Sequence, residues 1–166
     1  IYAAYLALHA LIEKARLSDE VLYVAFVDVN KAFPSVRRDI LFQKMSAAGA
    51  PDSLIRALWA VYSDASGTVR GPEGYGPLFE LLQGTREGGV ESPLLFTLYV
   101  WDVIDHLQLP PLHEGALTLD GQPVRALQLA DDLALVARSE ADLQTLLDSW
   151  AAYCDVTHVE TQLGKT

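Results

Sequence analysis

Polar and apolar residues alternate along residues 127–136, where two apolar arms flank a pair of adjacent aspartates. Leucines recur with a spacing of two on both sides of this pair, at Leu127, Leu129, Leu133 and Leu135. A period of two predicts strands, so Asp131 and Asp132 fall at the tip of a β-hairpin. Asp is a common turn residue, but paired carboxylates on a rigid hairpin also bind divalent metal ions well. Both interpretations stay open at this point.

A second strand is predicted by the nearly continuous apolar run of residues 21–29, which is rich in β-branched and aromatic side chains. Such a run is typical of a central strand that is buried on both faces. Asp28 is the one charged residue in it. A buried, unpaired carboxylate is costly, so Asp28 requires a cation, a partner or a strand end that is open to water.

Residues 37–64 are expected to be helical. A short helix over residues 39–48 ends at Gly49, and Pro51 suits the first turn of the next helix. The apolar stripe of that second helix consists of Leu54, Ile55, Leu58, Val61 and Tyr62. The glycine-rich residues 67–84 have β-prone ends and predict a hairpin.

A glycine-rich loop at residues 84–91 leads into a predicted helix over residues 92–107. Ser92 suits the N-cap of this helix, and Pro93 suits its first position. A flexible loop that leads into a helix N-terminus is a place where backbone N–H groups meet phosphate or a substrate strand. Many helices begin in this way, so the loop is a weak signal by itself.

The last third of the chain completes an α+β pattern. Paired strands are expected over residues 116–119 and 124–130, joined by the turn dipeptide Asp120-Gly121. Ser139 caps a helix over residues 139–154. We therefore expect residues 1–166 to form a single domain, in which an antiparallel sheet packs on one face against the helices of residues 92–107 and 139–154.

Composition limits the possible partners of the chain. The 166 residues carry a formal net charge of −10, and basic residues do not cluster beyond Arg37 and Arg38. A nucleic-acid function must then take its phosphate-binding charge from segments outside this sequence, or this chain binds weakly. No signal peptide or membrane-spanning run is found, and the single Cys154 suits an intracellular setting, nucleus or cytoplasm. The sequence starts within a helical pattern, which suggests a fragment.

Asp28 and the Asp131–Asp132 pair can converge if their strands are neighbours in one sheet. Three carboxylates in one place can hold two Mg²⁺ ions about 3.5–4 Å apart. Such ions stabilise the attacking and leaving oxygens of an in-line phosphoryl transfer.

Four motifs in this order resemble the palm domain of reverse transcriptases, most closely those of non-LTR retrotransposons. The segments are residues 26–33 (FVDVNKAF), 86–96 (REGGVESPLLF), 129–132 (LADD) and 162–166 (QLGKT). Each motif is weak by itself, whereas four in the right order are specific. The resemblance spans residues 21–166 and implies a polymerase palm with part of the fingers and no thumb. It further implies an RNA-directed DNA polymerase that takes an RNA template, a DNA primer and deoxynucleoside triphosphates.

The resemblance also assigns roles to individual residues. Asp28 and Asp131 correspond to the direct metal ligands, with Asp132 as a supporting carboxylate and the carbonyl of Val29 completing the coordination. The expected cofactor is Mg²⁺, with Mn²⁺ as an alternative. Lys165 corresponds to a lysine that protonates or neutralises the leaving pyrophosphate. An ordinary exposed lysine is the competing interpretation.

The nucleotide-binding residues implied by the resemblance are Phe33, Glu87, Gly88 and Ser92. Phe33 matches an aromatic under the incoming sugar, where a ring would exclude a 2′-hydroxyl; a core phenylalanine is the alternative. Gly88 and Ser92 would shape the pocket for the nascent base pair. Glu87 stands where the family has Gln, and its added negative charge should weaken nucleotide binding.

Two further departures count against activity, and two other functions stay open. Gln162 replaces the family's Asn, and the basic fingers segment and the thumb are missing. A decayed palm that acts as a non-enzymatic binding scaffold is the main alternative. An RNA-copying RNA polymerase shares the same palm logic, although Phe33 as a sugar gate speaks against it.

Overall fold

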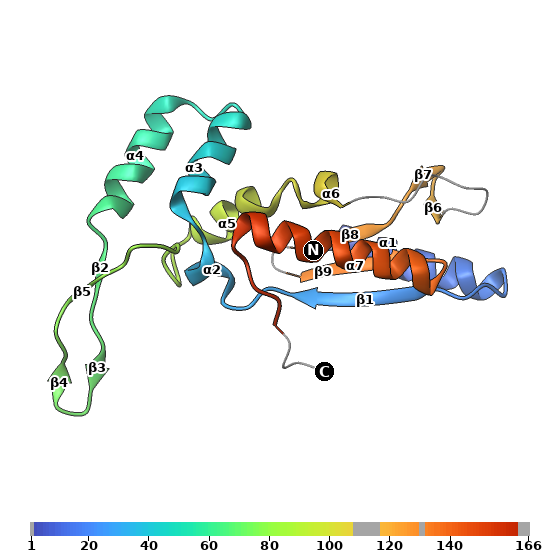
Figure 1. Cartoon of the computed structure of the whole chain (residues 1–166), viewed down its shortest axis with the longest axis horizontal. Coiled ribbons are helices and arrows are strands. Elements are labelled where there is room, and N and C mark those ends of the chain that lie inside the picture. Colours follow the sequence, from blue (N-terminus) through green and yellow to red (C-terminus); the bar gives the residue numbers. More distant parts are fainter. Residues whose placement is uncertain (1, 108–116, 130–131, 163–166) are drawn as a thin grey trace. The chain divides into compact units, whose positions relative to one another are not determined.

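The chain folds into two compact units. The computed structural model describes residues 2–107, 117–129 and 132–162. Residues 1–30 and 100–166 make the first unit, and residues 31–99 make the second. Helices and strands are both present, which confirms the predicted α+β class (Figure 1). The assignment of residues 1–166 to a single domain stays a prediction.

The first unit is built on a three-stranded antiparallel sheet with the order β1-β9-β8. Its strands are β1 (Tyr23–Asp28), β8 (Ala126–Leu129) and β9 (Asp132–Ala137). The prediction that residues 21–29 form a central strand buried on both faces is wrong, because β9 takes the central position. β1 lies at the edge, where Val27 is buried and Phe26 is 76% exposed. Apolar composition does not distinguish a strand buried on both faces from one that packs on a single face.

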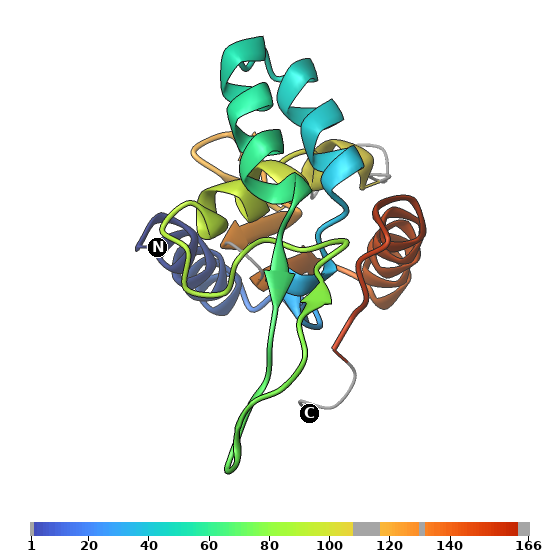
Figure 2. The same cartoon turned by 90° about the vertical axis from the view of Figure 1, so that its left-hand side faces the viewer.

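Two helices cover opposite faces of this sheet (Figure 2), so the prediction that helices pack on one face only is wrong. The reason is that β9 is buried at every residue from Leu133 to Ala137, so both of its faces are covered. On one face, Leu11 of α1 (Tyr2–Leu17) belongs to a core cluster with Val136 of β9, against which Val24 and Leu127 also pack. On the other side, α7 (Glu140–Thr157) contacts β9 and β1 and buries its own apolar stripe. The predicted cap of α7 is confirmed, because the Ser139 hydroxyl accepts a hydrogen bond from the Asp142 N–H at 3.1 Å.

The predicted helix over residues 92–107 is interrupted. It divides into α5 (Ser92–Val100) and α6 (Val103–His106). Asp102, at the break, accepts a hydrogen bond of 2.7 Å from the Tyr153 hydroxyl, a residue distant in sequence. The turn at Asp120 and Gly121 forms as expected, since both have positive φ and join β6 (Thr118–Leu119) to β7 (Gln122–Pro123).

The second unit contains a helical pair and a long hairpin, both near their predicted places. The short α2 (Ala32–Ser35) precedes α3 (Arg38–Ala47) and α4 (Asp52–Ser63). The hairpin pairs β2 (Ser66–Gly67) with β5 (Phe79–Glu80) and β3 (Arg70–Gly71) with β4 (Gly74–Tyr75), as Figure 1 shows. The apolar stripe of α4 is buried at Tyr62, whereas Leu54 and Val61 are exposed by nearly half.

Candidate functional site

The sheet register brings Asp28 and Asp132 directly opposite each other on neighbouring antiparallel strands. The Asp28 carbonyl accepts a hydrogen bond from the Gln162 N–H at 2.8 Å, so it points away from β9. Asp28 and Asp132 therefore form a non-hydrogen-bonded pair, the arrangement in which Cα atoms are about 4.5 Å apart and side chains are closest. Opposed residues project from the same face, which places the two carboxylates side by side. We call this part of the sheet the carboxylate end.

Like charges at directly opposed positions destabilise a sheet. Asp28 is half-buried and Asp132 is exposed, so water screens part of the repulsion. Two carboxylates on one face are also a suitable pair of hard oxygen donors for a divalent cation. Asp131, the third predicted carboxylate, lies outside the described residues. Among the residues that are described, no three His, Cys, Asp or Glu side chains gather closely enough to hold a metal ion.

The backbone around Val29 fits its predicted role as a carbonyl ligand. Val29 forms an antiparallel bridge with Thr161, flanked by hydrogen bonds from the Asn30 N–H to Glu160 and from the Gln162 N–H to Asp28. Carbonyls of successive strand residues alternate between the two edges. The Val29 carbonyl consequently faces the edge on which β9 lies, next to the carboxylate end.

The segment that precedes Lys165 is held against the same strand. Besides the backbone bridge, the Thr161 hydroxyl accepts a hydrogen bond of 2.9 Å from the Trp150 indole N–H of α7. The sequence pattern gives Thr161 no role, because a contact between α7 and the segment after it leaves no local pattern. Lys165 itself lies outside the described residues, so its role stays a prediction.

In the second unit, the loop of residues 84–91 docks on the segment that carries Phe33. The Gly84 and Thr85 N–H groups donate to the carbonyls of Val36 and Phe33 at 2.8 and 2.9 Å. Gly84 has a φ of +86°, and a Cβ there would lie 2.9 Å from the Pro34 Cα. Glycine is therefore required at this position.

Phe33 has both a packing contact and partial exposure. Its half-buried ring meets the Phe96 ring edge-to-face at a centroid distance of 6.0 Å. Phe96 belongs to the helix that follows the loop, so two of the motifs that resemble the reverse transcriptase palm touch each other here. The contact suits a core phenylalanine as well as a fixed sugar gate.

The remaining predicted nucleotide residues differ in exposure. Glu87 and Gly88 are exposed, and Gly88 has a φ of +81° with open space where a Cβ would be. Ser92 is fully buried and opens α5 as its first residue, while its hydroxyl donates to the Arg86 carbonyl at 2.6 Å. Ser92 thus shapes the loop from inside.

The chain matches the family model for reverse transcriptase (RNA-dependent DNA polymerase) over residues 4–166. The chain belongs to the reverse transcriptase family. It is 31% identical over 140 residues to the Pol polyprotein of a type-1 retrotransposable element R2 from Nasonia vitripennis. It is 27% identical over 143 residues to that of the type-2 element R2DM from Drosophila melanogaster. These alignments cover 84% and 86% of this chain but 13% of either relative.

Solved telomerase structures share the fold of this reverse transcriptase domain. An apo telomerase from Candida tropicalis superposes with a TM-score of 0.70 at 16% identity, over 99% of this chain and 31% of that one. A telomerase from Candida albicans, in complex with a fragment of telomeric RNA, gives a TM-score of 0.65 at 13% identity, over 98% of this chain and 29% of that one. The comparisons confirm the predicted family and its non-LTR type.

Two further findings concern metal ions and membranes. The family uses divalent metal ions, in agreement with the donors at the carboxylate end. No helix in the described parts of the chain is long and apolar enough to cross a membrane.

Proposed function

We propose that this chain supplies the palm and part of the fingers of an RNA-directed DNA polymerase of R2-like retrotransposons. In this role it extends a DNA primer on an RNA template with deoxynucleoside triphosphates. The observation that carries the proposal is the opposed pair of Asp28 and Asp132, which lies next to Asp131 in sequence. Two opposed carboxylates do not help a sheet to fold, whereas metal-dependent phosphoryl transfer requires carboxylates that lie close together.

The proposed cofactor is Mg²⁺, with Mn²⁺ as an alternative, held by Asp28, Asp131 and the Val29 carbonyl with support from Asp132. An ion held there would neutralise charge on the transferred phosphoryl group and would lower the pKa of the attacking hydroxyl. The protein itself positions the metal ligands. The rigid pairing of β1 with β9 fixes the carboxylate separation before substrate arrives.

The nucleotide is proposed to meet Phe33 at its sugar and the exposed loop around Glu87 and Gly88 at its base and phosphates. Ser92 supports this loop, and Lys165 would protonate or neutralise the leaving pyrophosphate. Glu87 is acidic where the family has Gln, so it repels the triphosphate. Glu87→Gln should raise kcat/KM for the nucleotide several-fold. This change corresponds to about 1 kcal/mol of additional transition-state stabilisation. An unchanged value would show that this position does not touch nucleotide.

The template and primer are proposed to be gripped mainly outside this chain. The chain spans about an eighth of the length of the Nasonia vitripennis and Drosophila melanogaster relatives. Its net charge of −10 opposes nucleic-acid binding, so basic fingers and thumb segments must supply the phosphate contacts.

Primer extension tests the proposal directly. A polymerase that contains this chain together with fingers and thumb segments is assayed on an RNA template with a DNA primer. Asp131→Asn should abolish extension, while Asp155→Asn, an exposed aspartate of α7, should not. Extension that survives Asp131→Asn would refute the proposal, and incorporation of ribonucleotides would indicate an RNA polymerase.

Glu87 and the acidic balance of the chain favour the binding scaffold as the second candidate. An unsubstituted protein that binds RNA but extends no primer would support it.

A further inference from the structure

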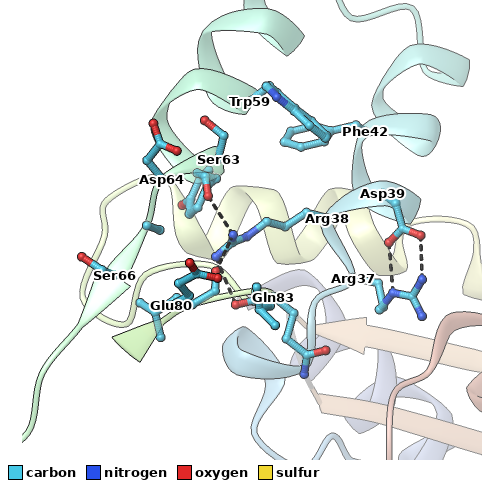
Figure 3. Close-up of a pocket in the computed structure, with 14 residues that line it drawn as sticks. Arg37, Arg38, Asp39, Phe42, Trp59, Ser63, Asp64, Ser66, Glu80 and Gln83 are labelled. Atoms are coloured by element: carbon cyan, nitrogen blue, oxygen red, sulfur yellow. Dashed lines mark hydrogen bonds and ion pairs between the residues drawn. The ribbon is translucent and has the colours of Figure 1, made fainter. Parts of the chain in front are cut away.

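Arg38, the first residue of α3, holds the backbone that leads into the 84–91 loop. Its guanidinium donates to four main-chain carbonyls, those of Gly84 (2.9 Å), Tyr62 (2.8 Å), Leu81 (2.7 Å) and Gln83 (3.1 Å). This side chain lines a pocket of about 690 Å³, together with residues of α3, α4 and the base of the hairpin. Figure 3 shows the side chains that line this pocket. One side chain thereby joins α3, the end of α4 and the start of the loop.

Tyr62 extends this contact to the far side of the loop. Its ring is 2% exposed and has the Arg38 guanidinium 5.1 Å from its centroid and that of Arg86 at 5.8 Å. Its hydroxyl donates to the Glu91 carboxylate at 2.9 Å. Burial lowers the pKa of Arg38 and raises the pKa of Tyr62, as expected for polar groups withdrawn from water.

The loop is consequently held near both ends, and its exposed residues lie between these contacts. Gly84 and Glu91 are bound to Arg38 and Tyr62, whereas Glu87, Gly88 and Val90 project outward, Val90 being 98% exposed. Glu87, Gly88 and Val90 are therefore accessible to a ligand.

We propose that Arg38 and Tyr62 are positioning residues that hold the 84–91 loop in the shape that receives the incoming nucleotide. This inference rests on the proposed function. The acceptors of Arg38 are carbonyls on two segments, the end of α4 and residues 81–84, so its planar fork recognises the path of the backbone. Lysine, with one nitrogen, cannot replace that geometry.

The chain contains a matched control for both residues. Arg70 lies over the ring of Tyr75 at 5.8 Å, in the same unit, but this pair sits on the hairpin and Tyr75 is 74% exposed. We call the contacts that Arg38 and Tyr62 make with the loop and its flanking backbone the clamp. Tyr62→Phe removes one hydroxyl and keeps the ring, so it tests the clamp without leaving a cavity in the core. Tyr75→Phe makes the same chemical change away from the loop, and Arg38→Lys is matched by Arg70→Lys.

Amide hydrogen exchange of the full chain measures how firmly residues 84–91 are held, independently of polymerase activity. Tyr62→Phe and Arg38→Lys should speed exchange in residues 84–91 by about tenfold, and the two controls should not. Unchanged exchange in both variants would overturn the clamp, whatever the protein does with primers.

Steady-state kinetics then tests the link to nucleotide, in a polymerase that contains the chain. Tyr62→Phe should raise KM for the deoxynucleoside triphosphate about fivefold to tenfold, with kcat and affinity for primer–template nearly unchanged. An unchanged KM in a variant with faster loop exchange would overturn the positioning role. Absence of extension in the unsubstituted protein would instead overturn the proposed function and leave exchange to decide whether the clamp holds the loop.

Discussion

The two ends of the three-stranded sheet are formed by the same strands but differ in their charged pairs. One end has an ion pair of opposite charges, and the other has two like charges. At the end of Tyr23 and Ala137, which we call the packed end, α1 covers the sheet and Leu11 and Val136 are almost fully buried. Arg138 and Glu20 form an ion pair there at 2.5 Å. At the carboxylate end, two aspartates face each other and the neighbouring Phe26 is largely exposed.

Under the proposed function, one end of this sheet serves stability and the other serves the reaction. Apolar burial and an opposite-charge pair stabilise the packed end. The carboxylate end breaks the usual rules for cross-strand pairs, and such violations concentrate at functional sites. The comparison predicts that substitutions at the two ends will have opposite effects on stability and activity.

The largest expected effect is on activity at the carboxylate end. If Asp28 is a direct metal ligand, as proposed, Asp28→Asn should reduce primer extension at least about 1000-fold, equivalent to about 4 kcal/mol in the barrier. Folding should be preserved, since Asn fits the same strand position. Single-turnover rates on an RNA template measure this effect. A loss below tenfold would remove Asp28 from the metal site.

Truncation at the packed end should act on stability. Leu11→Ala leaves a cavity against Val136 and should lower the free energy of unfolding by about 2–5 kcal/mol. Urea denaturation followed by circular dichroism measures the change. A cost under 1 kcal/mol would mean that α1 contributes little to this core.

Trp150→Phe sharpens the comparison, because it connects packing to the carboxylate end. The variant keeps most of the ring volume and loses the 2.9 Å hydrogen bond to Thr161, whose segment pairs with the backbone of Asp28 and Asn30. Stability should fall by about 1 kcal/mol, and extension should slow several-fold. Unaffected extension at reduced stability would confine Thr161 to a purely structural role.

The smallest expected effects have opposite signs. Without divalent cations, Asp132→Asn should raise the free energy of unfolding by about 0.2–1 kcal/mol, because it removes a like charge from the pair. Arg138→Gln should lower it by up to about 1 kcal/mol, as for other exposed ion pairs. Chemical denaturation in EDTA compares the two variants, and equal signs would contradict the contrast between the ends.

Local signals made much of the fold predictable. The Ser139 cap, the turn at Asp120 and Gly121 and the antiparallel arm that begins with Asp132 depend on a few neighbouring residues, and the structure has all three. Edge and central strands share one composition, so the position of β1 was predicted wrongly. The break near Asp102 forms where a bond to distant Tyr153 is available, which no helical pattern reveals.

The candidate site was predictable only in part: the sequence indicates its carboxylates, but not the contacts that hold the neighbouring loop. Motif order identified Asp28 and Asp132, and the register places them together. The contacts of Arg38 were not predictable, because its partners are backbone carbonyls, which have no residue signature. The roles of Asp131 and Lys165 stay predictions, since these residues lie outside the described part of the chain.

The central claim, that the carboxylate end is a metal site, is tested most directly by unfolding with and without Mg²⁺. The unsubstituted chain should gain about 2.7 kcal/mol at a Mg²⁺ concentration a hundred times Kd, as required by linkage. Asp28→Asn should gain little from Mg²⁺. An equal response of both proteins to Mg²⁺, or no response of the unsubstituted chain, would contradict the account.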